Sequence, residues 1–330
     1  MILKSMTKLL LAGDVGGTKT LLGLFEPANP RPARLHARPY GTLDFKALPD
    51  MIDAFLRESG TPPDRISTAS FGAAGPVIDR AATLTNVPWR VDTRDVANAF
   101  PFESVHLLND LQAMAYSVWV LDDSELLVLQ DGQAQPEGNI AIIAAGTGLG
   151  EALLHSMAGR RIPSPSEGGH ADFAARTERE IALTRDLTRR YGRADVEHVI
   201  SGRGLVNLHR ICHANGCKAG VNLEDPSAPA AITAAALARS CTGCVEVLDM
   251  FVEAYGAEAG NLALRSVATG GVFIGGGIAP KIAPAMTNGS FMRAFRDKAP
   301  LDAMLRAMPV KMVMNEEAGL LGAAVYANSI

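Results

Sequence analysis

Residues 13–20 read GDVGGTKT, and they lie between two short apolar runs at residues 9–12 and 21–25. Two short apolar runs on either side of a glycine-rich turn predict a β-hairpin. This hairpin, near the start of the chain, is the first element of the predicted fold.

The turn of this hairpin has the features of a phosphate site. Gly16 and Gly17 can adopt positive φ, so the chain can bend tightly and leave its N–H groups unobstructed. Successive N–H groups form a nest for phosphate oxygens, and Thr18 and Lys19 add a hydroxyl and a positive charge. Asp14 beside an anion site indicates a divalent cation or its water shell. No Walker A pattern is present, and a plain hairpin turn is the alternative.

The composition is that of a globular chain with room for two domains. It has 330 residues, 48% hydrophobic and 20% charged, and domains usually contain about 100–200 residues. The net charge of -4 provides no basic surface for nucleic acid. No apolar run reaches the ~18 residues that span a bilayer, and residues 1–8 lack a signal-peptide core. We therefore expect a cytoplasmic protein with neither nucleic acid nor membrane as partner.

The cysteines form C-x4-C and C-x2-C pairs, at Cys212, Cys217, Cys241 and Cys244. These spacings invite a zinc interpretation. However, residues 241–244 are predicted to open a helix, and His209 and His213 lie at a predicted helix end without zinc-finger spacing. We therefore expect reduced, ordinary buried thiols.

Strand-like and helix-like patterns alternate along the chain, which predicts α/β domains. Strands are expected at residues 66–74, 105–108, 140–145, 272–274 and 310–314. Helices are expected at residues 45–59, 111–120, 178–191, 245–267 and 316–327, the fourth interrupted by Gly256 and Gly260. The Pro- and Arg-rich residues 27–39 are predicted to be a connector. A glycine-rich turn follows a strand near residues 13, 146 and 275, which is consistent with two similar halves.

Asn109 and Asp110 lie where a predicted strand ends and a helix begins, which is where α/β sheets carry ligand groups. Asn109 with Gln112 also fits a capping box worth about 1 kcal/mol. Both interpretations can hold, because a helix N-terminus keeps Asp110 ionised, as a general base for a hydroxyl must be.

Residues 166–172 read SEGGHAD and place Glu167 and His170 on either side of a flexible Gly-Gly pair. Such a loop suits a small polyhydroxylated ligand, because Glu167 accepts from hydroxyls and His170 donates or accepts. A hydrolase triad is disfavoured, since no G-x-S-x-G nucleophile elbow is present. An ordinary surface loop is the alternative.

Two further glycine-rich turns follow predicted strands. The first is a second phosphate-turn candidate at Gly146, Thr147 and Gly148, although its spacing does not fit the dinucleotide motif. The second, at residues 275–277, suits the close approach of a ribose and base, with close helix–sheet packing as the alternative.

Together these stretches resemble the bacterial glucokinase family, within the sugar kinase, Hsp70 and actin superfamily. The matching stretches cover nearly the whole chain in family order: LAGDVGGTKT, LTNVPW, LLNDLQAMAYSV, AAGTGLGEALL, PSEGGHADFA, ISGRGLVNLHR, GGVFIGGGIAPK and EEAGLLGAA. The resemblance implies two α/β domains of the ribonuclease-H-like, actin-like ATPase type with an interdomain cleft. The small domain would hold residues 1–120 and 311–330, and the large domain residues 121–310.

The resemblance also implies an activity, the ATP-dependent phosphorylation of glucose at its 6-hydroxyl in glycolysis, with Mg²⁺ as the metal. Asp110 would be the general base. The implied sugar ligands are Asn86, Asn109, Asp110, Glu167, His170 and Glu197. The implied ATP-binding residues are Gly13, Asp14, Val15, Gly16, Gly17, Thr18, Gly146, Thr147, Gly148, Gly275, Gly276 and Gly277. Mg²⁺ would lie near Asp14, held through ATP and water.

Several alternatives to a zinc-free glucokinase can be weighed from the residues. Related repressors and sugar kinases carry a Cys-rich zinc motif soon after E-G-G-H, and residues 171–181 contain no cysteine. A sugar-responsive transcription factor would need a helix-turn-helix domain of ~60 residues before the hairpin, and we expect none in the twelve residues before Gly13. Asp110 and the loop at 166–172 argue against an actin-like filament protein.

The residues leave the substrate details open. A kinase for fructose, mannose or an N-acetylhexosamine is the closest alternative, and polyphosphate or ADP are alternative donors. Translation can start at Met1 or Met6. We expect a homodimer, because twofold dimers are the commonest closed assembly.

Overall fold

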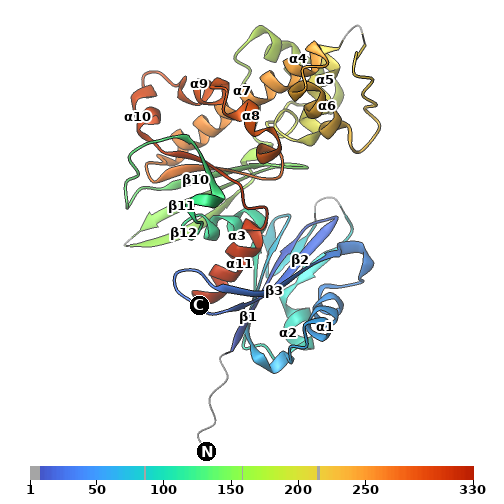
Figure 1. Cartoon of the computed structure of the whole chain (residues 1–330), viewed down its shortest axis with the longest axis vertical. Helices are drawn as coiled ribbons and strands as arrows, with labels where there is room; N and C mark the ends of the chain where they lie inside the picture. Colours follow the sequence, from blue (N-terminus) through green and yellow to red (C-terminus); the bar gives the residue numbers. More distant parts are fainter. Residues whose placement is uncertain (1–7, 85–86, 158, 214–215) are drawn as a thin grey trace, which may run out of the picture. The chain divides into compact units, whose positions relative to one another are not determined.

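The computed structural model describes residues 8–84, 87–157, 159–213 and 216–330, and the chain divides into two compact units. Unit 1 comprises Met1–Asp122 with Asn315–Ile330, and unit 2 comprises Asp123–Met314. Each unit contains a mixed α/β arrangement, which confirms the predicted class (Figure 1).

Unit 1 is built on a five-stranded sheet of order β3-β2-β1-β4-β8. Its strands are β1 (Leu9–Val15), β2 (Lys19–Glu26), β3 (Ala33–Gly41), β4 (Ile66–Ala73) and β8 (Ser104–Asn109). A small sheet contains β5 (Val77–Ile78), β6 (Ala81–Thr83) and β7 (Arg90–Asp92). The helices are α1 (Leu48–Ser59), α2 (Thr93–Ala99), α3 (Asp110–Ser117) and α11 (Ala318–Asn328).

Helices cover both faces of the unit 1 sheet, and β1 shows why. Side chains alternate across a strand, so Leu9 and Leu11 pack in the core with α1, while Leu10 and Ala12 pack in the core with α3 and α11. A strand buried on both faces reads as a continuous apolar run. The predicted hairpin is present, with Val15 of β1 opposite Thr20 of β2.

Unit 2 is built on a six-stranded sheet of order β12-β11-β10-β13-β14-β9. Its strands are β9 (Leu126–Gln130), β10 (Ile140–Ala145), β11 (Leu149–Met157), β12 (Arg160–Ser166), β13 (Gly271–Gly275) and β14 (Val310–Val313). Its helices are α4 (Glu178–Tyr191), α5 (Gly202–Cys212), α6 (Ala228–Leu237), α7 (Thr242–Ser266), α8 (Ala283–Met286), α9 (Ser290–Arg296) and α10 (Asp302–Ala307).

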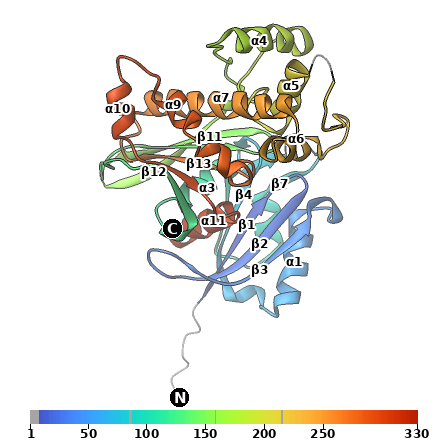
Figure 2. The same cartoon turned by 45° about the horizontal axis from the view of Figure 1, so that its top comes forward.

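The long helix α7 lies across one face of this sheet (Figure 2). It is continuous, so the predicted interruption at Gly256 and Gly260 is wrong. An added Cβ at Gly256 would meet the carbonyl oxygen of Phe291, and one at Gly260 would lie 2.6 Å from that of Phe295. These glycines therefore let α9 pack closely on α7.

Two edge strands differ from the sequence-based expectation. Residues 27–39 were predicted to be a connector, but their second half forms β3, paired with β2. β12 at the edge of the other sheet also pairs without having been predicted. β3 is largely exposed, and edge strands tolerate proline and charge because one side needs no sheet partner. Such strands lack the apolar alternation that marks a buried strand.

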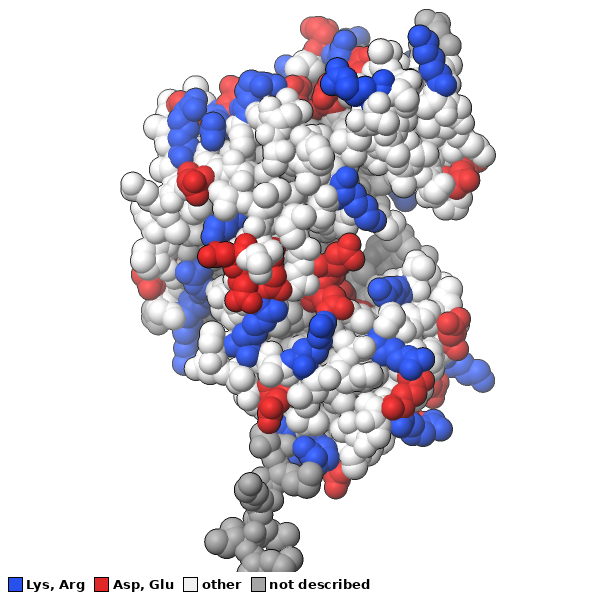
Figure 3. Space-filling model, viewed as in Figure 1, with Lys and Arg blue, Asp and Glu red and all other residues white. Residues whose placement is uncertain are grey.

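No single helix in the described part of the chain is long and apolar enough to cross a membrane, although α6 and α7 pass that test as a pair bent by 103°. Basic and acidic side chains are interspersed on the face drawn in Figure 3.

Candidate active site

The β1–β2 turn in unit 1 is held by hydrogen bonds. The Gly16 N–H donates to the Lys19 carbonyl at 3.1 Å, and the Thr42 hydroxyl donates to the Gly16 carbonyl at 2.7 Å. The Thr42 N–H donates to the Thr18 carbonyl at 3.1 Å. Gly16 does not adopt positive φ, contrary to the prediction; its missing Cβ instead allows the Lys19 oxygen to approach, 2.9 Å from where a Cβ would lie. The turn is therefore tight and buttressed from the segment after β3.

Asp14 lies beside this turn, on β1. A Cβ added at Gly319, near the start of α11, would lie 2.9 Å from Asp14 Oδ2, so α11 approaches the carboxylate closely. Burial raises the pKa of Asp14 to about 6, against the opposing influence of Lys19. A carboxylate whose charge is disfavoured by burial is stabilised by a cation, so this side chain suits a hard divalent metal.

Asn109 and Asp110 lie at the junction of β8 and α3. The predicted capping box is present: Asn109 Oδ1 accepts from the Leu111 N–H at 3.0 Å, and Gln112 Oε1 accepts from the Asn109 N–H at 3.1 Å. Asn109 Nδ2 also donates to the Gly75 carbonyl at 3.1 Å. Asp110 Oδ1 accepts from the Leu111 N–H at 2.8 Å, so its carboxylate is positioned at the positive end of α3.

The turn between β10 and β11 in unit 2 is the second turn that the sequence predicts to bind phosphate. The Gly146 N–H donates to the Gly148 carbonyl at 2.8 Å, and the Gly202 N–H of α5 donates to the Gly146 carbonyl at 2.9 Å. Thr147 at its tip is exposed. The N-terminal end of α5 thus supports this turn.

The turn at residues 275–277 follows β13. Gly276 has φ +82°, a left-handed conformation that favours glycine, and an added Cβ there would meet the Ala145 carbonyl oxygen. The buried Tyr255 of α7 accepts from the Ala145 N–H at 3.1 Å, and its hydroxyl lies 3.2 Å from the Gly275 carbonyl. Tyr255 therefore joins the ends of β10 and β13, where two of the predicted nucleotide turns begin.

The predicted sugar loop follows β12. Glu167 and His170 are exposed, and between them Gly168 and Gly169 pack tightly. An added Cβ at Gly168 would meet the Glu151 carboxylate, and one at Gly169 would meet the Leu149 carbonyl oxygen. The glycine pair is thus fixed by close packing, which corrects the predicted flexibility.

Asp195 orients His170. Its Oδ2 lies 3.3 Å from His170 Nδ1, and the Asp195 side chain is only 9% exposed, against 50% for His170. An ionised carboxylate accepts, so Nδ1 donates and Nε2 remains an acceptor for a ligand hydroxyl. Arg193 also donates to the His170 carbonyl at 2.6 Å. Asp195 was not predicted; a carboxylate two residues before Glu197 was the only signal in the sequence.

Glu197 connects the predicted phosphate turn to the predicted sugar loop. Its Oε2 accepts from the Leu149 N–H at 2.9 Å and would lie 2.6 Å from a Cβ added at Gly148. Its backbone N–H donates to the Gly169 carbonyl at 2.8 Å. One residue therefore ties the two segments together within unit 2.

Glu151 lies beneath this loop and was also missed. It is 1% exposed, and its Oε1 has no hydrogen-bond partner among the described residues. Burial, with a smaller contribution from Glu258, raises the pKa of Glu151 to about 7. Its position inside an apolar strand, directly after the glycine turn, was the available sequence signal.

The structure brings the predicted residues together in two groups. Unit 1 holds Gly13, Asp14, Val15, Gly16, Gly17, Thr18, Asn109 and Asp110, and unit 2 holds the remaining described ones. Asn86 lies outside the described residues.

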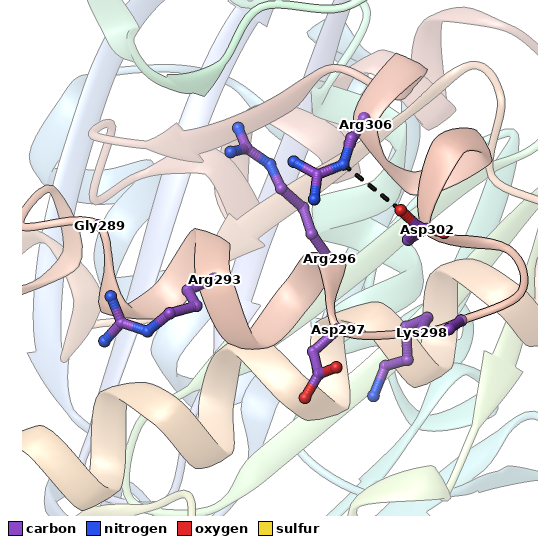
Figure 4. Close-up of a pocket in the computed structure, with 8 residues that line it drawn as sticks. Gly289, Arg293, Arg296, Asp297, Lys298, Asp302 and Arg306 are labelled. Atoms are coloured by element: carbon purple, nitrogen blue, oxygen red, sulfur yellow. Dashed lines mark ion pairs between the residues drawn. The ribbon is translucent and has the colours of Figure 1, made fainter.

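A pocket of about 470 Å³ lies elsewhere in unit 2, between α9 and α10. Figure 4 shows its charged lining, in which Arg306 pairs with Asp302 at 3.6 Å. None of the predicted site residues lines it.

Comparison with known proteins first defines the class as sugar kinases. The fold matches the crystal structure of a glucokinase from an Antarctic psychrotroph, with a TM-score of 0.85 and 28% identity over 98% of this chain and 100% of that one. It also matches a glucokinase from Balamuthia mandrillaris in complex with glucose, with a TM-score of 0.79 over 100% of this chain and 96% of that one. At 20% identity, the second match shows the fold alone.

The sequence comparisons then define the family. The Glucokinase family model matches residues 11–330. A glucokinase from Nostoc sp. (strain PCC 7120) is 39% identical, over 97% of this chain and 98% of the relative. The chain belongs to the glucokinase family, which confirms the resemblance found in the sequence.

Proposed function

We propose that this chain is a glucokinase that transfers a phosphoryl group from ATP to the 6-hydroxyl of glucose. The observation that carries the proposal is the position of Glu197, which is bonded to the end of one glycine turn and to the loop that carries Glu167 and His170. A sugar kinase needs a phosphate-binding group and a hydroxyl-binding group held in fixed register. Family membership supports the same activity.

In this proposal Asp110 accepts the proton of the attacking hydroxyl. The Leu111 N–H fixes its carboxylate, and the capping box around Asn109 fixes the start of α3. Proton transfer to a positioned base contributes about 10²–10⁴-fold to a rate. Phosphoryl transfer otherwise depends on alignment and on neutralising charge.

The sugar and nucleotide groups have complementary roles. Glu167, Glu197 and His170 bind hydroxyls, with His170 held by Asp195. The turns at residues 16–18, 146–148 and 275–277 bind the nucleotide. Asp14 would hold Mg²⁺ through water, and the metal would neutralise charge on the phosphates. The close approach of Gly319 leaves the carboxylate partly buried, an environment that a cation compensates.

The proposal includes finer points that the resemblance implies. The three antiparallel strands followed by parallel ones in each unit support a ribonuclease-H-like type. The predicted cleft, the homodimer and the cytoplasmic location stay predictions.

A coupled assay of ADP release tests the activity with Mg²⁺-ATP and a panel of hexoses. We expect preference for glucose, and we expect Asp110→Asn to lower kcat by about 10³-fold while glucose binding stays measurable. Asp50→Asn, an exposed carboxylate in the first turn of α1, is the matched control and should keep full activity.

Other outcomes change the proposal in defined ways. Preference for fructose, mannose or an N-acetylhexosamine would change the proposed substrate but not the proposed kinase activity. Turnover only with polyphosphate or ADP would change the proposed phosphoryl donor. An unchanged kcat in Asp110→Asn would refute Asp110 as the general base. No turnover with any hexose would refute the proposed activity and favour an actin-like nucleotide-binding protein.

A further inference from the structure

A cluster of histidine and cysteine side chains lies in unit 2, apart from the predicted sugar and nucleotide residues. Cys217 Sγ is 3.9 Å from the Sγ of Cys241 and 3.9 Å from that of Cys244. His213 Nε2 is 3.3 Å from Cys241 Sγ and 3.8 Å from Cys244 Sγ. Four potential ligand atoms therefore lie close together, where the end of α5 meets the start of α7.

We propose that His213, Cys217, Cys241 and Cys244 bind one structural Zn²⁺ ion. Zinc bonds of about 2.3 Å to sulfur and 2.0–2.1 Å to nitrogen give tetrahedral edges of about 3.8 Å between sulfurs and about 3.5 Å between sulfur and nitrogen. The four distances given above agree with these edges to within about 0.3 Å. One histidine and three cysteines are a usual donor set for a closed zinc site.

The surrounding hydrogen bonds prepare these ligands. His213 Nδ1 lies 3.0 Å from the His209 carbonyl. A carbonyl can only accept, so Nδ1 carries the proton and the Nε2 lone pair points to the cysteines. A metal-binding histidine usually donates its other N–H in this manner. Cys241 Sγ accepts hydrogen bonds from the backbone N–H groups of Cys244 and Ala219, and Cys241 is the N-cap of α7.

Other roles for the cluster fit less well. A disulfide has an S–S bond of about 2.05 Å, whereas the cysteines here are free and at least 3.9 Å apart in the pairs given above. Cys241 and Cys244 are 3% and 0% exposed, which disfavours a catalytic nucleophile. Apolar packing alone does not explain why the sulfurs of Cys241 and Cys244 both lie close to His213 Nε2.

Cys212 provides the internal contrast. It belongs to α5, one residue before His213, but its Sγ lies 3.8 Å from the Met250 sulfur. This is the contact of an ordinary, partly buried thiol. The sequence-based expectation of ordinary thiols therefore fits Cys212, and we infer a different role for the other three cysteines.

His209 is a second internal contrast. Its ring stacks on His213 with centroids 3.7 Å apart, and its two buried nitrogens have no hydrogen-bond partner among the described residues. A nitrogen of His209 also lies within 4.8 Å of ligand atoms of His213, Cys217 and Cys244. We exclude it from the ligand set because Cys241 Sγ lies at tetrahedral-edge distances from both His213 Nε2 and Cys217 Sγ.

The zinc would join two helices that support predicted nucleotide turns. The N-terminal end of α5 donates from Gly202 to Gly146, and Tyr255 of α7 bonds Ala145. The zinc would hold the C-terminal end of α5 to the N-terminal end of α7. Its role is therefore structural, and this inference does not depend on the proposed glucokinase activity.

Metal content of the full chain tests the inference. Protein produced with added zinc and kept reduced should contain about one zinc ion per chain by mass spectrometry. Cys217→Ser and Cys241→Ser should reduce zinc to background. Cys212→Ser is the matched control and should retain it, as should His209→Gln. Chelation should lower the thermal midpoint of the wild-type protein, and added Zn²⁺ but not Mg²⁺ should restore it.

A second measurement covers variants that fail to fold. Wild-type protein loaded with Co²⁺ should show the visible absorption of a tetrahedral, thiolate-bound ion. Background zinc in the wild type together with no such absorption overturns the inference. Equal zinc loss in Cys212→Ser and Cys217→Ser overturns it too. Zinc that depends on His209 but not on Cys241 refutes the stated ligand set.

Discussion

The main sheets of units 1 and 2 follow the same plan and use it differently. In β3-β2-β1-β4-β8 and in β12-β11-β10-β13-β14, the first three strands are antiparallel, and the β1 or β10 strand then pairs in parallel with the next strand. A glycine turn follows β1 at residues 16–18, and another follows β10 at residues 146–148. The next-to-last residue of β1 is Asp14, and the next-to-last residue of β10 is Ala144. Only the first turn therefore carries its own carboxylate.

The segments that follow β3 and β12 in the chain differ as well. β3 leads into Thr42, whose hydroxyl and N–H bind the neighbouring glycine turn. β12 leads instead into Glu167 and His170, which face solvent. One sheet uses this position to buttress a turn, and the other uses it to present the proposed hydroxyl-binding groups. The same strand plan therefore carries different segments at this position in the two units.

The largest effect that would sharpen this comparison is expected at Gly276 in unit 2. Gly276→Ala places a Cβ against the Ala145 carbonyl oxygen at φ +82°. We expect a loss of about 3 kcal/mol in the free energy of unfolding, from backbone strain and overpacking. Gly277→Ala is the matched control, because nothing lies within 4 Å of its added Cβ. Urea unfolding of both variants measures the difference, and equal stabilities would contradict the close packing of the turn.

The next effect tests the carboxylate that unit 1 has and unit 2 lacks. Because burial raises the pKa of Asp14 to about 6 from 3.8, the ionised form costs stability at neutral pH. The folded state binds the proton more tightly, so this cost is absent well below pH 3.8 and grows as pH rises to about 6. Asp14→Asn should therefore stabilise the apo protein at pH 7.5 by up to about 3 kcal/mol, and by about half of that at pH 5.

The same substitution should weaken the use of Mg²⁺-ATP, since the amide is a poorer metal ligand. The KM for Mg²⁺-ATP should rise while the KM for glucose stays constant. Urea unfolding at the two pH values, with Asp50→Asn as the control, measures the stability change. A gain that does not shrink toward pH 5 would refute the buried charge.

The elements that the sequence predicted well are those with a local signal. Helix α4 spans Glu178–Tyr191, the range predicted from its amphipathic pattern, and ends at Gly192; the structure adds a capping box at Thr177. The β1–β2 hairpin follows from its apolar runs. By contrast, β3 and β12 owe their structure to backbone pairing with a neighbour, so their side chains carry little information.

The proposed site residues also differ in how far a local sequence signal predicted them. Asp110 follows from its place between a strand and a helix. Glu197 came only from the family resemblance, because its hydrogen bond to Leu149 joins residues 48 apart. Spacing within a motif cannot reveal such a contact, and the same holds for Cys217 and Cys241.

A smaller effect tests the junction between the turn and loop in unit 2. In Glu197→Gln the amide oxygen can still accept from the Leu149 N–H, so the turn should keep its stability. A glucose hydroxyl would lose a charged acceptor, worth about 1.5–3 kcal/mol. We expect the KM for glucose to rise by about 10-fold or more, with the KM for ATP unchanged. Glu178→Gln in the exposed first turn of α4 is the control. A rise in the KM for ATP alone would assign Glu197 to the phosphate turn.

The smallest effect compares two capping boxes, one in each unit. Asn109 caps α3 beside the proposed base, and Thr177 caps α4, where none of the proposed site residues lies. Replacing either with alanine removes a side-chain acceptor for helix N–H groups and should cost about 1 kcal/mol of stability. Only Asn109→Ala should also lower kcat/KM for glucose, because it frees the start of α3 and removes the bond to Gly75. Urea unfolding and steady-state kinetics on both variants separate these effects. An equal kinetic loss in Thr177→Ala would mean that stability alone governs the rate. A loss confined to Asn109→Ala would indicate that Asn109 acts in the proposed site, by positioning the base or by binding the sugar.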